Sequence, residues 1–183
     1  MSNLIVIQYL TLDGVVEDPD GRGGTHFGGW AFRWGPDAIA GDKFRLGSIM
    51  QTGALLFGRR TWEHFSAFWP ARTGDFPDAM NAARKLVATS TAIDPSQWSG
   101  SVALDGDLAE AVAREKAERD VVVIGSTSVA QALAAAGLVD EYRFLLVPTA
   151  VGDGRRLFEQ PVQLVPVESE PAGPMTYLRL STS

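Results

Sequence analysis

Short apolar runs bounded by glycine or polar turns recur along the chain and predict its strands. The first, residues 4–10, is apolar and β-branched except at Gln8, which is typical of a strand buried on both faces. Similar runs predict strands over residues 54–58, 85–89, 101–104 and 121–124. Alternation of side chains near the end of the chain indicates antiparallel strands over residues 141–148, 162–168 and 176–180.

Segments with helical spacing of apolar residues separate these strands. One helix is predicted to run from Pro36 to the stop at Gly53, with Asp42 on it. Other helices are predicted over residues 59–68, 78–83, 108–118 and 129–136. The alternation predicts an α/β fold with a mostly parallel central sheet flanked by helices and with antiparallel strands at its C-terminal edge. No linker-like stretch divides the chain, so residues 1–183 are predicted to form a single domain.

Composition excludes several classes of partner and site. The net charge of −6 argues against nucleic acid, whose binding proteins usually present a basic face. No apolar run approaches the roughly 20 residues of a membrane helix, and no basic leader precedes the first strand, so no membrane contact and a cytoplasmic location are expected. With no cysteine, and with no third ligand spaced to join His26 and His64, no metal site is expected.

Residues Gly58, Arg59, Arg60 and Thr61 come directly after a predicted buried strand and open a predicted helix. A helix N-terminus offers unpaired N–H groups to an anion, glycine allows close approach, and two arginines can clamp a phosphate. The alternative is that both arginines are solvated surface charges and Thr61 is an ordinary helix cap.

Two further strand ends carry hydroxyl groups. They are the turn of Gly125, Ser126 and Thr127, and the segment of Thr89, Ser90 and Thr91. Backbone and hydroxyl donors there could hold phosphate, although an N-cap explains the serines almost as well. Ligands of open α/β sheets gather at the carboxyl ends of strands, so the three segments together predict a long, phosphate-bearing ligand.

Two carboxylates and one aromatic group are candidates for binding a second molecule. Asp13 follows the first strand and Asp42 lies on the first predicted helix. A buried carboxylate can orient or protonate a nitrogen heterocycle, with a pKa raised by desolvation. A solvated helix face is an equal alternative for Asp42. The aromatic group could stack a flat ring, but large aromatics are more often core. Its members are Phe27, Trp30, Phe32 and Trp34.

The order of these segments resembles the dihydrofolate-reductase-like superfamily, and in particular the C-terminal reductase domain of bacterial bifunctional riboflavin-biosynthesis deaminase-reductases. The matching pieces are residues 11–14, 56–63, 123–126, 137–141 and 148–158. The common Gly-Gly turn of the superfamily is Gly125-Ser126 here. The zinc deaminase half is missing, since it needs cysteines that the chain lacks.

The resemblance implies an NADPH-dependent reductase that transfers hydride to a small pyrimidine- or pteridine-like molecule, similar to 5-amino-6-(5-phosphoribosylamino)uracil reductase. Arg59, Arg60 and Thr61 would hold adenosine-side phosphates. The other cofactor residues implied are Gly14, Gly58, Thr89, Ser90, Thr91, Gly125, Ser126 and Thr127. Asp13 and Asp42 would act on the substrate. The alternative functions are those of a dihydrofolate reductase proper and of a nucleotide-binding domain without catalysis.

The late strands predict a homodimer. Residues 141–148 are apolar on both faces, and no helix is predicted after Gly154 to cover them. At the edge of a sheet such a strand would need a partner subunit. The alternative is that the last strands fold back onto their own sheet.

Overall fold

The computed structural model describes residues 1–182, which form two compact units. Unit 1 comprises Met1–Val6 and Leu46–Val139, and unit 2 comprises Ile7–Arg45 and the chain from Asp140 on. Strand β1 (Leu4–Thr11) contributes to both. That residues 1–183 form one domain remains a prediction.

Unit 1 alternates strands and helices, as the sequence predicts. Its elements are α2 (Ile49–Thr52), β2 (Ala54–Gly58), α3 (Arg59–Phe68), α4 (Asp75–Ala82), β3 (Arg84–Ala88), the 3-10 helix η2 (Pro95–Gln97), β4 (Ser101–Ala103), α5 (Leu108–Glu118), β5 (Val121–Gly125) and α6 (Thr127–Ala135). Predicted helix 78–83 therefore begins earlier, at Asp75, and predicted helix 129–136 begins at Thr127.

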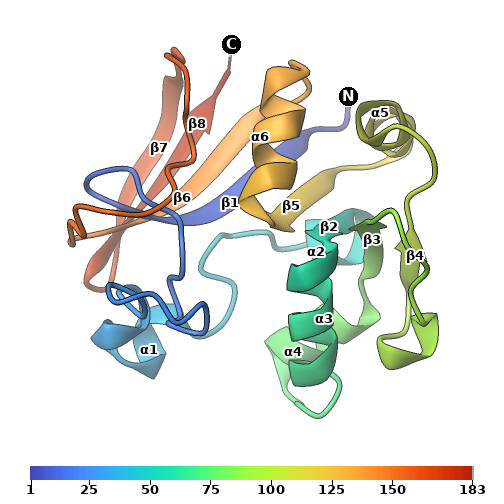
Figure 1. The fold of residues 1–183 in the computed structure, drawn as a ribbon, viewed down its shortest axis with the longest axis horizontal. Coiled ribbons are helices and arrows are strands. Elements are labelled where there is room, and N and C mark those ends of the chain that lie inside the picture. Colours follow the sequence, from blue (N-terminus) through green and yellow to red (C-terminus); the bar gives the residue numbers. More distant parts are fainter. Residues whose placement is uncertain (183) are drawn as a thin grey trace. The chain divides into compact units, whose positions relative to one another are not determined.

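The strands of unit 1 are parallel, and β2, β3 and β5 are largely buried. Strand β2 pairs with β3 on one side and with β5 on the other, and every residue of β2 is buried. Helices α5 and α6 pack against β5 (Figure 1), and α3 packs against β2. Continuous apolar strands covered in this way place their carboxyl ends, and the turns that follow, along one edge.

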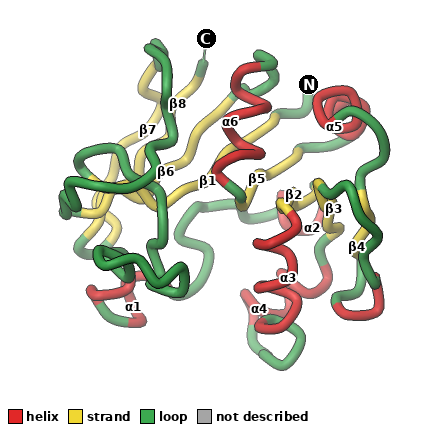
Figure 2. The backbone as a smooth tube through the Cα atoms, viewed as in Figure 1, coloured by secondary structure: helices red, strands yellow, loops and turns green. Residues whose placement is uncertain are grey.

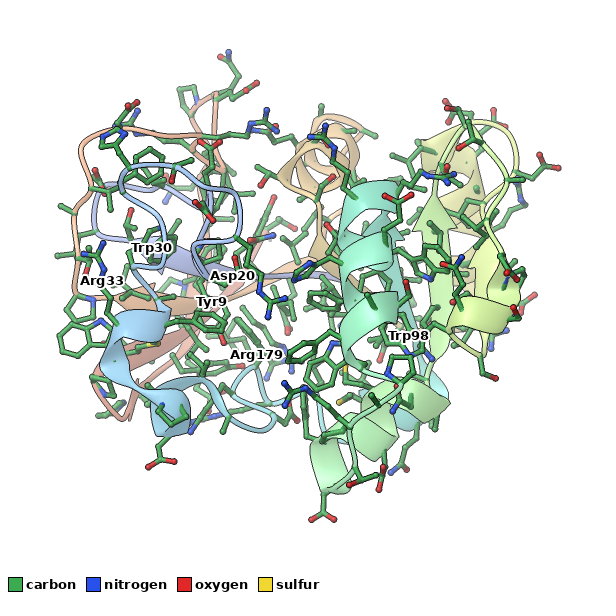
Figure 3. The ribbon with its side chains drawn as sticks, turned by 60° about the horizontal axis from the view of Figure 1, so that its bottom comes forward. Tyr9, Asp20, Trp30, Arg33, Trp98 and Arg179 are labelled. Atoms are coloured by element: carbon green, nitrogen blue, oxygen red, sulfur yellow. The ribbon has the colours of Figure 1, made fainter. Side chains whose placement is uncertain are left out.

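Unit 2 contains η1 (Phe32–Trp34), α1 (Pro36–Ile39), β6 (Glu141–Val147), β7 (Val165–Ala172) and β8 (Met175–Ser181). Strand β8 pairs antiparallel with both β6 and β7. Its core includes Trp30 (labelled in Figure 3), Leu145 and Tyr177. Loops make up much of the rest (Figure 2), notably residues 12–31 and 148–164.

The strands follow the order β4-β3-β2-β5-β1-β6-β8-β7. The predicted α/β class, with antiparallel strands at one edge of a mostly parallel sheet, is confirmed. Strand β6 is not at the edge, and all its residues except Leu146 are buried by the same chain. The reason given for a homodimer is therefore wrong, and the homodimer itself stays a prediction. The edge strand is β7, shifted from predicted 162–168 to Val165–Ala172 and largely exposed.

The single helix predicted from Pro36 is wrong. The structure has two one-turn helices, Pro36–Ile39 and Ile49–Thr52, joined by turns. Gly41 and Gly47 have φ of +75° and +52°, and Arg45 has φ of +54°. Left-handed backbone at these three places cannot continue a right-handed helix. Asp42 consequently lies in a loop.

No helix within residues 1–182 is long and apolar enough to cross a membrane. Nor does that part of the chain gather three His, Cys, Asp or Glu side chains able to hold a metal ion.

Candidate functional site

Two tight turns of unit 1 pack directly on each other where β2 and β5 end. A Cβ atom on Gly58 would lie 2.7 Å from Ser126 Oγ. One on Gly125, which has φ of +156°, would lie 3.3 Å from Thr61 Oγ1. The Gly125–Ser126 peptide bond is cis. Both glycines are buried, and their lack of a Cβ lets the two turns pack together at the point where both following helices begin.

The N-termini of α3 and α6 have no side-chain cap. Neither Gly58, the N-cap of α3, nor Ser126, the N-cap of α6, makes a side-chain capping hydrogen bond. The neighbouring helix α5 differs, because Asp107 Oδ1 accepts a hydrogen bond from the Glu110 N–H at 3.1 Å. The capping explanation for the hydroxyl residues therefore does not hold, and two adjacent helix starts keep donors for an anion.

Arg59 ties the start of α3 to the segment after β3. Its Nη1 donates to the carbonyl oxygens of Ala92 at 2.9 Å and Thr91 at 3.3 Å, and it also contacts Thr91 Oγ1. A weaker contact of 3.4 Å reaches Thr89 Oγ1. Its Nε pairs with Glu63 Oε1 at 2.8 Å. Arg59 is thus a positive charge that hydrogen bonds hold beside Thr89, Ser90 and Thr91, although its side chain is partly exposed.

Arg60 is exposed, and its guanidinium makes no hydrogen bond or ion pair with residues 1–182. The pair of arginines therefore splits into one that holds a loop and one available to a ligand. A bound phosphate would give Arg60 the charge-assisted partner that it lacks.

A cavity of about 350 Å³ lies beside the same segment. Its lining residues are Ala88, Thr89, Ser90, Leu104, Gly106 and Leu108. They come from the ends of β3 and β4 and the start of α5. The lining contains both hydroxyl groups and leucine side chains, which suits a molecule that has both a polar and an apolar part.

In unit 2, Asp13 is fixed by the loop that follows β6. Its carboxylate accepts hydrogen bonds from Thr11 Oγ1 at 2.6 Å, the Gly152 N–H at 2.7 Å and the Val151 N–H at 3.3 Å. These donors, the Thr11 hydroxyl first, lower the pKa of Asp13 to about 2. The expectation that desolvation raises this pKa is therefore wrong. Gly14 follows with φ of +81°, and its N–H donates to Thr11 O.

The aromatic group divides between core and surface. Trp30 is fully buried, and its Nε1 donates to Glu17 O at 2.8 Å, while Phe27 packs against the core cluster. Phe32 and Trp34 keep 42% and 44% of their area exposed. The core interpretation therefore holds for the first two residues only.

Sequence reasoning missed Asp18, which organises the glycine-rich loop of residues 17–29. Asp18 is buried, with φ of +53°, and accepts hydrogen bonds from the Gly23 N–H at 2.6 Å and from the Thr25 N–H and hydroxyl at 2.9 and 2.8 Å. Burial alone would raise its pKa, but the Thr25 and Gly23 donors outweigh burial and lower it. The sequence feature that could have indicated this role was an aspartate within a glycine-rich loop.

The structure also resembles solved structures at low sequence identity. A putative riboflavin biosynthesis protein from Shewanella sp. PV-4 has a TM-score of 0.74 at 18% identity, with 98% of each chain covered. A diaminohydroxyphosphoribosylaminopyrimidine deaminase/5-amino-6-(5-phosphoribosylamino)uracil reductase from Thermotoga maritima has a TM-score of 0.59 at 16% identity. That match covers 98% of this chain and 56% of the other.

Dihydrofolate reductase from Enterococcus faecalis, complexed with NADP(H), has a TM-score of 0.53 at 16% identity, with 98% and 95% of the two chains covered. At these identities the likenesses establish a dihydrofolate-reductase-like fold. Among curated protein sequences, none matches. The family model described as the RibD C-terminal domain matches residues 3–178, nearly the whole sequence. The chain therefore belongs to the RibD C-terminal domain family.

Proposed function

We propose that this protein is an NADPH-dependent reductase acting on a small pyrimidine- or pteridine-like molecule. Family membership and the reductase named among its structural neighbours support the reaction class. The observation that carries the cofactor is the pair of adjacent, uncapped helix starts at Gly58 and Ser126, with a fixed arginine beside them.

The residues of unit 1 fit a dinucleotide with a 2′-phosphate. The first-turn N–H groups of α3 and α6, which begin side by side where Gly58 and Gly125 let the two turns pack together, would donate to the diphosphate. Ser126, Thr127 and Thr61 add hydroxyl donors. The cavity lined by Thr89 and Ser90 would accept the adenosine end.

Arg59 and Arg60 have different parts in this proposal. Arg59, together with Thr91, would bind the 2′-phosphate, because its guanidinium is already held at the end of β3. Arg60 would pair with the diphosphate. When bound, NADPH supplies the hydride, and the protein contributes position and electrostatics.

On the substrate side, we propose Asp13 and Asp42 as the polar residues. Asp13 is ionised at neutral pH, since three donors keep its pKa near 2. It would therefore orient a donor of the substrate, such as a ring N–H, and would not give up a proton. Gly14, in the same turn, would let the cofactor approach the backbone.

The test is the choice between cofactors. We expect NADPH to bind at least roughly tenfold more tightly than NADH and to raise Tm further, because a charge-assisted hydrogen bond to the 2′-phosphate contributes about 1.5–3 kcal/mol. Calorimetric titration and thermal melts measure both quantities.

Replacing Arg59 with alanine should remove the preference, and replacing Arg60 should weaken both cofactors alike. Arg114→Ala, on α5, is the control and should change neither affinity. Equal affinity of the unmodified protein for NADPH and NADH would contradict the proposal.

A further inference from the structure

The carboxylate of Glu63 lies on the guanidinium that is proposed to bind the 2′-phosphate of the cofactor. Glu63 follows Arg59 by one turn of α3, and its Oε1 accepts a hydrogen bond from Arg59 Nε at 2.8 Å. Within residues 1–182, Glu63 forms no other ion pair. An acidic side chain thus occupies one edge of the cation that a phosphate would need.

The position of Arg59 does not depend on this carboxylate alone. Its Nη1 donates to the carbonyl oxygens of Ala92 at 2.9 Å and Thr91 at 3.3 Å, in the segment after β3. The same nitrogen contacts the Thr91 hydroxyl. These uncharged acceptors would keep the guanidinium in place if the charge of Glu63 were removed.

The remaining nitrogen of the guanidinium is the one open to a ligand. Arg59 Nη2 has no hydrogen-bond partner among residues 1–182, and the side chain is 38% exposed. A phosphate bound at Nη2 would share one small, planar cation with Glu63. The two anions would therefore lie within about 6 Å of each other, a distance at which like charges disfavour each other.

The balance of charge at this place shows which way Glu63 acts. A guanidinium carries one positive charge, which Glu63 already balances, whereas a phosphate brings about 1.5 to 2 negative charges at neutral pH. The Glu63 side chain is 48% exposed, so water and salt weaken the repulsion without removing it. A phosphate at Arg59 would therefore bind less tightly than at an unpaired arginine.

We propose that Glu63 is a specificity-determining residue that lowers the affinity of this site for a 2′-phosphate. It limits how strongly the protein prefers NADPH to NADH, which lacks that phosphate. The effect comes from the charge of the carboxylate, and a neutral amide in its place removes it. This rests on the proposed function, since it concerns the site proposed for NADPH.

The experiment compares the unmodified protein with Glu63→Gln, which removes the charge but keeps an oxygen that can accept from Arg59 Nε. Calorimetric titration measures the affinities for NADPH, NADH and adenosine 2′,5′-bisphosphate. We expect Glu63→Gln to bind NADPH and the bisphosphate about 3- to 10-fold more tightly, the size of one like charge removed at this distance near the surface. The affinity for NADH should not change.

Salt provides a readout that a merely structural role of Glu63 would not move. Repulsion between exposed charges is screened at high ionic strength, so the gain in NADPH affinity should shrink between about 0.02 and 0.5 M NaCl. Glu118→Gln is the matched control, because Glu118 is also exposed and pairs with Arg119 at 2.7 Å, at the last residue of α5. It should bind all three probes as the unmodified protein does.

The inference is overturned if Glu63→Gln binds NADPH no more tightly than the unmodified protein, or if its affinities for NADPH and NADH rise together. A gain that persists undiminished in high salt would also overturn it. The proposed function fails separately, if the unmodified protein binds both cofactors equally. A preference for the 2′-phosphate that then appeared only in Glu63→Gln would support the inference without the proposed function, and no preference in either protein would overturn both.

Discussion

In unit 1 the groups proposed to bind a ligand are mainly backbone N–H groups that follow the ends of regular strands, whereas in unit 2 the loops depend on single polar side chains. Gly58 and Ser126 begin two helices whose first turns lack side-chain acceptors. By contrast, Asp13, Asp18 and Arg143 each hold a loop of unit 2 by several hydrogen bonds. A site made from secondary structure tolerates side-chain changes, and loops held by one residue do not.

The largest loss of stability is expected for Arg143→Met. It would leave Glu141 with Arg179 alone and would deprive two loop carbonyls of their donor. We expect the free energy of unfolding to fall by about 3 kcal/mol, as for other broken buried pairs. Urea unfolding followed by circular dichroism measures this change.

Arg45→Met is the control for that substitution. Arg45 pairs with Glu168 and Glu170 at 2.5 and 2.6 Å, but its side chain is 38% exposed. We therefore expect a loss of less than about 1 kcal/mol. If both variants lost the same stability, burial of the Arg143 pair would not matter.

A second test replaces Asp18 with alanine. Three donors in the glycine-rich loop would lose their acceptor, so the free energy of unfolding should fall by about 2 kcal/mol. Limited proteolysis should then cut the loop faster. Asp20→Ala is the matched control, and a loop cut equally fast in both variants would contradict the role given to Asp18.

Helix α5 provides a comparison within unit 1. Asp107→Ala removes a cap whose side chain accepts from Glu110 N–H, and should cost about 1 kcal/mol. Ser126→Ala removes no cap, and should change stability by less than about 0.5 kcal/mol. Thermal melts of the two variants measure both changes in stability. A larger loss of stability for Ser126→Ala would contradict the difference between the two helix starts.

The smallest effect expected is a change in pH dependence at Asp13. Its pKa is about 2 in the folded protein and 3.8 ordinarily, so the unfolded state binds more protons between these values. The stability that this carboxylate contributes is complete above about pH 4 and is lost as the pH falls toward 2. Asp13→Asn should therefore lose stability less steeply from pH 4 to 2, and parallel curves there would rule out the role.

Regular elements of the fold were predictable because each depends on a local signal. The apolar run of residues 54–58 and the helix from Arg59 to Phe68 agree with the structure residue for residue. The prediction of one helix from Pro36 was wrong because the spacing of apolar residues carries no information on backbone handedness. Arg45 adopts a positive φ although it is not glycine. Contacts with β7 and β6, more than ninety residues away, help to fix that loop, and no local pattern reveals them.

The candidate site was predictable to a similar extent. Glycines and hydroxyl residues at strand ends were enough to mark Gly58, Ser126 and Thr89. No pattern could show that Arg59 would hold the segment after β3, or that Asp13 would accept N–H groups from Val151 and Gly152. Both depend on pairings between distant parts of the chain.

The discontinuity of unit 2 has a kinetic consequence. Its two stretches are separated by the whole of residues 46–139, and bonds such as Leu12 N–H to Thr149 O join them. Closing a loop of about one hundred residues costs roughly 4 kcal/mol of chain entropy, so these bonds form late. During synthesis, β2, β3 and β5 can pair with one another before β6 has left the ribosome. The turn carrying Asp13 and the loop held by Arg143 must wait for that last segment, so their ordering is expected to be the final step of folding.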